Sequence, residues 1–176
     1  MTKGSQTDSR GMSTTMTALA WIVFMVLVGF YFNELLQKQR NPNQVLQTRY
    51  TEENTREVSL VGNKYGHYVT SGQVNGRSVI FMLDTGATGV AIPATIAEKL
   101  NIPRGRPVQV QTANGMATSY LTQLDSVSVG DITLYDVDAA IVPGYNSDQI
   151  LLGMSFLRHI EFTQKGRTLV LKQYYQ

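Results

Sequence analysis

The sequence predicts an all-β globular domain, small and either closed or sandwiched, preceded by a single membrane-spanning helix. Three observations carry this prediction. An uncharged, largely apolar run occupies residues 12–32, short apolar runs alternate with turn residues from Val58 onward, and four glycine-containing dipeptides separate pairs of such runs. A chain of 176 residues holds one domain of this kind with its appendages.

The composition excludes several classes of function. Lys and Arg number 15 against 13 Asp and Glu, and this near-balance gives no basic face for a nucleic-acid partner. The sequence has no cysteine, which rules out disulfides, thiolate zinc sites and cysteine nucleophiles. Its two histidines, His67 and His159, lie far apart. We therefore expect neither a metal site nor a cofactor.

The apolar run from Met12 to Phe32 would span about 31 Å as a helix, roughly one hydrocarbon core. The residues that follow include no small residue of the kind a signal peptidase needs. We therefore expect an uncleaved anchor over residues 12–36 that contacts the lipid bilayer, after an N-terminal tail of residues 1–11. The alternatives are a buried helix of a soluble protein and a cleaved signal peptide.

Basic residues flank the run on both sides, and they favour an inside N-terminus only slightly. Residues 37–57 are polar, without a period of 2 or 3.6, and are interpreted as a linker. The globular domain is expected over residues 58–176.

Within this domain, four dipeptides predict β-hairpins: Asn75-Gly76, Asn114-Gly115, Gly130-Asp131 and Lys165-Gly166. Residues 93–100 predict a short helix with a proline near its start, and residues 154–158 predict a second one. The domain is thus expected to contain short strands and one or two short helices.

The most informative stretch is the apolar run Val79–Leu83, which leads directly into Asp84. A carboxylate at the end of a buried strand is costly unless something uses or pairs it. Thr85 adds a hydroxyl, and Gly86 allows close approach of backbone. The triplet by itself is also compatible with an ordinary turn.

Three segments in order resemble the retropepsin-type aspartic proteases, and most closely their bacterial membrane-anchored branch. These segments are residues 81–88 (FMLDTGAT), residues 112–115 (TANG) and residues 151–157 (LLGMSFL). The similarity runs from about Val58 to Lys172. It implies a retropepsin-like fold, peptide-bond hydrolysis and a homodimer without a cofactor.

The resemblance also implies roles for single residues. Asp84 matches the catalytic aspartate, and Thr85, Gly86, Ala87 and Thr88 match the active-site loop. Ala113, Asn114 and Gly115 match the tip of the flap that covers a bound peptide, and Leu152 and Gly153 match the segment that supports the catalytic loop. The retroviral enzymes usually carry an acidic residue where Thr88 stands and an arginine where Met154 stands, so this chain departs from them at both positions.

Aspartic proteolysis needs two carboxyl groups that share one proton, because two close like charges cannot both ionise cheaply. This chain supplies one Asp-Thr-Gly triplet. Its other aspartates after residue 84 are expected on the solvated surface: Asp125, Asp131, Asp136, Asp138 and Asp148. The second carboxyl group is therefore expected from Asp84 of another copy.

The sequence thus predicts a single-pass protein of the bacterial inner membrane with a periplasmic aspartic endopeptidase domain that cleaves peptides or proteins as a homodimer. One alternative is a non-catalytic module on the same fold that binds peptides or only dimerises. Another is an enzyme that cuts its own linker between Gln37 and Glu57.

Overall fold

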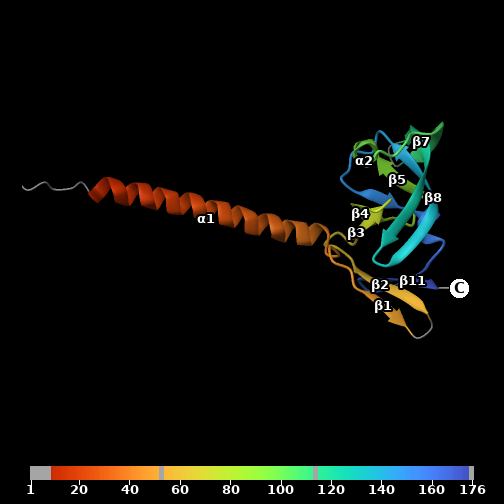
Figure 1. Cartoon of the computed structure of the whole chain (residues 1–176), viewed down its shortest axis with the longest axis horizontal. Helices are drawn as coiled ribbons and strands as arrows, with labels where there is room; N and C mark the ends of the chain where they lie inside the picture. The colour runs from red at the N-terminus through yellow and green to blue at the C-terminus, as the bar shows by residue number, and fades with distance from the viewer. Residues whose placement is uncertain (1–8, 52–53, 113–114, 175–176) are drawn as a thin grey trace, which may run out of the picture. The chain divides into compact units, whose positions relative to one another are not determined.

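The computed structural model describes residues 9–51, 54–112 and 115–174. The chain divides into two units, residues 1–38 and 39–176. The first unit holds most of a long helix, α1 (Ser9–Arg40), and the described residues of the second form eleven strands and two short helices. Figure 1 shows these elements from the red N-terminus to the blue C-terminus.

α1 has 32 residues, which is about 48 Å at helical rise. Its segment Thr14–Arg40 is long and apolar enough to cross a membrane. Apolar side chains such as Trp21, Phe24 and Phe30 are more than half exposed. A helix that is apolar on all sides needs an apolar environment. By length and composition, this helix could be a membrane span or a signal sequence.

The second unit is built from two sheets. The larger has the strand order β3-β4-β9-β5-β8-β7-β6, and β3 also pairs with β7, which closes it. Its strands are β3 (Tyr68–Val74), β4 (Arg77–Leu83), β5 (Val90–Pro93), β6 (Pro107–Thr112), β7 (Gly115–Val129), β8 (Ile132–Val142) and β9 (Ile150–Leu152).

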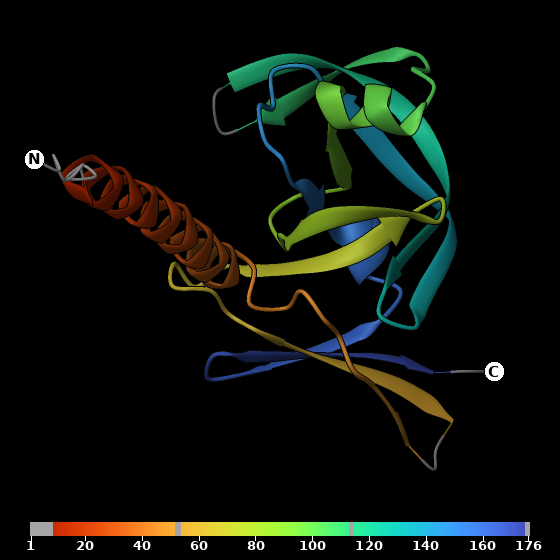
Figure 2. The ribbon, with the colours of Figure 1, turned by 60° about the vertical axis from the view of Figure 1, so that its left-hand side comes forward.

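The smaller sheet has the order β1-β2-β11-β10 and joins both ends of the unit. Its strands are β1 (Thr48–Thr51), β2 (Thr55–Val61), β10 (Glu161–Lys165) and β11 (Thr168–Tyr174). Figure 2 shows this sheet, in orange and dark blue, on one side of the larger one. The two short helices are α2 (Ala94–Leu100) and α3 (Met154–Leu157). The prediction of a small closed β domain with one or two short helices is confirmed.

One hydrophobic core connects the two sheets. Val58 and Leu60 of β2 and Leu171 of β11 are fully buried, and they belong to the same cluster as Phe81 of β4 and Leu152 of β9. Burial of each such side chain contributes about 1.5–3 kcal/mol relative to exposure. The core therefore fixes the smaller sheet against the strands that carry the candidate site.

The four predicted hairpins all form, two of them with a shifted turn. β3 pairs with β4 around Asn75-Gly76, and β7 pairs with β8 around Gly130-Asp131, as predicted. At the β6–β7 hairpin the last pair is Thr112 with Gly115, so Gly115 belongs to β7 and the pairing ends one residue earlier than expected. At the β10–β11 hairpin the last pair is Lys165 with Thr168, one residue later than expected. In the last hairpin this places Gly166, at φ 60°, in the turn, where glycine tolerates a left-handed conformation.

The segment interpreted as a linker differs in the structure. Residues 37–57 contain the end of α1, all of β1 and the first residues of β2. Asn43 is only 5% exposed, and its side-chain Nδ2 donates to the carbonyl oxygens of Val61 (2.9 Å) and Val69 (2.7 Å). Its Oδ1 accepts from the Val61 amide at 2.7 Å. Polarity indicated a solvated linker, but here the polar groups satisfy buried backbone.

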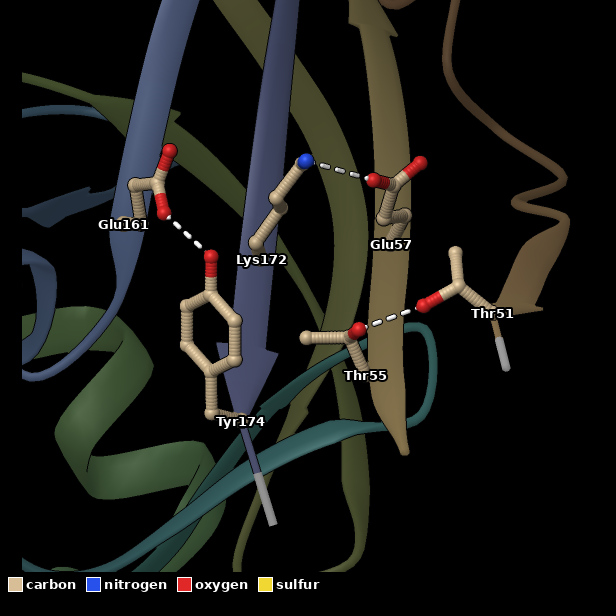
Figure 3. A network of polar contacts seen from close by, with 6 residues as sticks. All are labelled: Thr51, Thr55, Glu57, Glu161, Lys172 and Tyr174. Atoms are coloured by element: carbon tan, nitrogen blue, oxygen red, sulfur yellow. Dashed lines mark hydrogen bonds and ion pairs between the residues drawn. The ribbon is translucent and has the colours of Figure 1, made fainter. Parts of the chain in front are cut away.

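The outer face of the smaller sheet carries a row of charges across three strands (Figure 3). Lys172 of β11 lies opposite Glu161 of β10 and Glu57 of β2. Its Nζ is 2.8 Å from Glu57 Oε1, while Tyr174 donates a hydrogen bond of 2.6 Å to Glu161. The hydrogen bond to Glu57 raises the pKa of Lys172, and the charges of nearby acidic groups add to this shift.

Candidate active site

Asp84 lies where β4 ends, directly after the apolar strand that the sequence indicated. Its backbone amide donates to the Leu152 carbonyl at 3.2 Å. Its carboxylate Oδ1 accepts from the Gly86 amide at 2.9 Å, and its carbonyl accepts from the Ala87 amide at 3.2 Å. These bonds close a tight turn that holds the half-buried carboxyl group at the edge of the core.

The segment Leu152–Met154 supports this turn. β9 pairs with β4 in parallel, with Leu152 beside Leu83, and so brings the segment to the turn. The Met154 amide then donates to the Ala87 carbonyl at 2.9 Å. The two predicted groups of site residues, one near residue 84 and one near residue 153, are therefore brought together.

Gly153 lies where this support leaves no room for a side chain. A Cβ atom at this position would sit 2.3 Å from the Gly89 carbonyl oxygen and 2.6 Å from that of Ala87. Both contacts are with backbone, which cannot move aside as a flexible side chain can. For steric reasons, only glycine therefore fits at position 153.

Ser155 is a contact of the loop that sequence reasoning missed. Its hydroxyl accepts from the Val90 amide at 3.0 Å and donates to the Asp138 carbonyl at 2.8 Å. The available signal was a small polar residue inside the otherwise apolar run of α3. Polar residues in such runs are usually hydrogen-bonded when buried.

The loop that follows Asp84 faces outward. Thr85, Gly86 and Thr88 are exposed, and Ala87 is half-buried. Two cavities, of about 930 and 570 Å³, both border Ser78–Ile80 near the start of β4, and neither is lined by the Asp84 loop. In the single chain the half-buried Asp84 is therefore followed by a loop whose residues are mostly exposed. A lone carboxylate there can bind water or a donor.

The predicted flap corresponds to the β6–β7 hairpin, in which residues 107–112 pair with residues 115–120. Gly115 has a φ of 102°, in the region that favours glycine. Ala113 and Asn114, the other predicted flap residues, lie outside the described residues.

The other aspartates do not compete with Asp84. All five lie on the exposed surface, as expected: Asp125, Asp131, Asp136, Asp138 and Asp148. Asp131 has a structural partner, because Tyr50 donates to its Oδ2 at 2.6 Å, and this bond raises the pKa of the tyrosine. Within the described ranges, no group of three or more His, Cys, Asp or Glu residues could hold a metal ion.

The closed sheet, with an Asp-Thr-Gly turn supported by a Leu-Gly segment, has the fold of the retropepsin-like aspartic proteases. The family model described as gag-polyprotein putative aspartyl protease matches residues 70–159, about half of the chain, and the chain belongs to that family. Its fold is similar to the crystal structure of a retropepsin-like aspartic protease from Rickettsia conorii. The TM-score is 0.57 at 24% identity, over 73% of this chain and 94% of that one.

A curated relative from a Sinorhizobium species is described as an uncharacterized protein in the cobV 5′ region. It is 36% identical over 115 residues, which are 64% of this chain and 49% of that protein. The chain thus spans about half of the length of this relative.

Proposed function

We propose that the protein is a membrane-anchored aspartic endopeptidase that hydrolyses peptide bonds as a homodimer. The observation that carries this proposal is the Asp84 turn, supported from beneath by Leu152 and Gly153 and open on its outer side. A carboxyl group beside an exposed loop suits a site that a second chain completes, because aspartic proteolysis requires a second carboxyl group beside the first.

In the proposed dimer, the two Asp84 carboxyl groups share one proton. The ionised member takes a proton from a bound water, and the water oxygen attacks the carbonyl carbon of the scissile bond. The protonated member donates its proton to the carbonyl oxygen, which gives a gem-diol intermediate. The C–N bond then breaks as one carboxyl group protonates the amide nitrogen and the other takes a proton from the gem-diol, so that a carboxylic acid and an amine leave and the pair again shares one proton. The pair titrates with two macroscopic pKa values that belong to the pair rather than to either residue.

The remaining loop and flap residues have proposed supporting roles. Thr85 would reach the loop of the other subunit, Gly86 and Ala87 would lie beside the substrate, and Thr88 would belong to the same active-site loop. The flap tip, residues 113–115, would close over the peptide. No metal or cofactor takes part in this mechanism.

The test is peptide hydrolysis by the full chain in detergent, with Asp84→Asn as the variant. Asparagine keeps an oxygen that can accept the Gly86 amide hydrogen bond, so the turn is expected to survive while the acid–base chemistry is lost. Activity should fall by about 10³-fold or more. Asp125→Asn, the same change at an exposed site on β7, should leave activity unchanged.

Two results would reject the proposal. Wild-type activity in Asp84→Asn would eliminate the mechanism. A wild type that binds extended peptides without cleaving any of them would support the non-catalytic module instead.

We further propose that α1 anchors the protein in the bacterial inner membrane and that the β domain is periplasmic. The apolar segment within Thr14–Arg40 supports the anchor, and the slight charge bias supports the orientation. A C-terminal reporter that is active only in the periplasm tests the orientation. Signal from a cytoplasmic reporter at the same position would reverse it, and recovery of a form shortened after the apolar run would replace the anchor with a cleaved signal peptide.

A further inference from the structure

We propose that Ser155 is a positioning residue for the Asp84 loop. Its hydroxyl would hold the far end of the loop so that Asp84 can meet its counterpart in the dimer. The inference rests on the proposed function, and it adds a residue that acts through the loop rather than on the substrate. The evidence for this role is a pair of hydrogen bonds that the buried Ser155 side chain makes.

Ser155 uses both hydrogen-bonding capacities of its hydroxyl group. The residue is 8% exposed, and its Oγ lies 3.0 Å from the Val90 nitrogen and 2.8 Å from the Asp138 oxygen. One side chain of α3 therefore connects the first residue of β5 to the middle of β8. These contacts are 65 and 17 residues apart in sequence.

The loop between β4 and β5 is held at three points. At its start the Asp84 amide donates to Leu152, and in its middle the Ala87 carbonyl accepts from Met154. Both of these bonds join backbone groups, and the second also needs the space that Gly153 leaves. At its end, Val90 is held by the Ser155 hydroxyl. Of the three, this bond is the one that a side chain makes.

Loss of the hydroxyl would leave the Val90 amide without this partner in a buried place and would remove a part-buried contact of the Asp138 carbonyl. The end of the loop would then open more often, and Asp84 would be held less accurately. Catalysis by two carboxyl groups is sensitive to such displacement, because a misplacement of about 1 Å can cost about 10²-fold in rate. Binding of the peptide elsewhere in the groove would change less.

The kinetic test compares Ser155→Ala with Ser155→Thr in the full chain, at a temperature where both are folded. Ser155→Ala should lower kcat by about 10- to 100-fold with KM within about twofold. The two pKa values of its pH–rate profile should move closer together, since a looser pair shares its proton less tightly. Ser155→Thr retains a hydroxyl and should recover most of kcat. Cysteine has a similar shape to serine and forms weaker hydrogen bonds, so the kcat of Ser155→Cys should lie between those of Ser155→Ala and Ser155→Thr.

Thr70→Val is the matched control. Thr70 is fully buried in β3, and its hydroxyl donates to the Asn43 carbonyl at 3.3 Å, away from the loop. The Thr70→Val variant should have lower thermal stability than the wild type and an unchanged kcat. If Ser155→Ala lowers activity only as much as its folded fraction falls, or changes KM alone, the inference is wrong.

A second measurement is independent of activity. In Ser155→Ala, the Val90 amide should exchange with solvent at least about tenfold faster, while the Val127 amide in β7 keeps its wild-type rate. In Thr70→Val, Val90 should stay protected. An unchanged Val90 rate in Ser155→Ala would overturn the inference, whether or not the wild type is active. An inactive wild type together with a faster Val90 rate in Ser155→Ala would mean that the proposed function alone has failed.

Discussion

Gly153 shows how a single residue sets the geometry of the candidate site. The backbone of this residue passes so close to the Ala87 and Gly89 carbonyl groups that no other residue fits. The close approach allows the Met154 amide to reach Ala87. Hence the support of the Asp84 loop depends on the absence of a side chain at position 153.

We predict that Gly153→Ala destabilises the full chain by about 1–3 kcal/mol, because the new methyl group must displace backbone. Peptide hydrolysis should fall by more than the loss of folded protein explains, since the displaced backbone belongs to the Asp84 loop. Chemical denaturation in detergent and peptide hydrolysis measure the two effects. Gly144→Ala is the control, because a Cβ there meets nothing within 4 Å. Equal stability of the two variants would contradict the steric overlap expected at position 153.

At the scale of elements, the segment after α1 is part of the domain fold. Asn43 bridges β2 and β3 through its side chain, and its carbonyl accepts from the Ser71 amide at 3.1 Å. Asn41, 6% exposed, accepts from the Asn43 amide at 3.0 Å through its Oδ1. Self-cleavage around these residues would first require this segment to leave the domain, which costs its buried hydrogen bonds.

Asn43→Ala should therefore destabilise the domain by about 2–4 kcal/mol, because backbone groups of Val61 and Val69 lose buried partners. Asn146→Ala, at an exposed position, should change stability by less than about 0.5 kcal/mol. Thermal unfolding of both variants checks this. If residues 37–57 behaved as a solvated linker, both variants would be equally stable.

The charge row on the smaller sheet predicts a dependence of stability on alkaline pH. The pKa of Lys172 is raised in the folded state, mainly by its hydrogen bond to Glu57. The folded protein thus holds this proton more tightly than the unfolded chain. The stabilisation is complete below the ordinary lysine value of 10.5 and is lost as the pH rises through the higher folded value.

Lys172→Met should therefore reduce the loss of stability between about pH 8 and about pH 11. The midpoint of urea unfolding at several pH values measures it. Lys165→Met, at an exposed position on β10, should leave the alkaline loss as in the wild type. The effect should be small and sensitive to salt, because the Lys172 and Glu57 side chains are partly exposed. Identical slopes for the two variants would exclude the pair as the cause.

At the scale of the whole molecule, the proposed chemistry requires two chains, and a mixing experiment tests this. Asp84→Asn chains should pair with wild-type chains. Each mixed dimer then has only one of the two Asp84 carboxyl groups and should be inactive. With random pairing and a threefold excess of the variant, wild-type activity should fall to about one quarter. Peptide hydrolysis after co-expression and solubilisation measures it. Undiminished activity would mean that a single subunit is sufficient.

Local signals in the sequence were enough for the strands, the hairpins and the position of Asp84. Alternating apolar residues and turn dipeptides act over a few neighbours, and so does the proline that precedes α2. The same signals misplaced two turns by one residue, because pairing across the whole strand decides the register. The polar segment after α1 was misread, since its partners in β2 and β3 are 18 and 26 residues away.

The sequence by itself determined that one carboxyl group stands at the end of an apolar strand in a β domain behind an apolar helix. Only the tertiary structure decided what holds that group: the Leu152 carbonyl, the space at Gly153 and the Ser155 hydroxyl, which is 65 residues from Val90. It also decided that Asn43 belongs to the domain. Such contacts form when distant segments pack on one core, and residue order alone carries no record of which buried polar groups will meet.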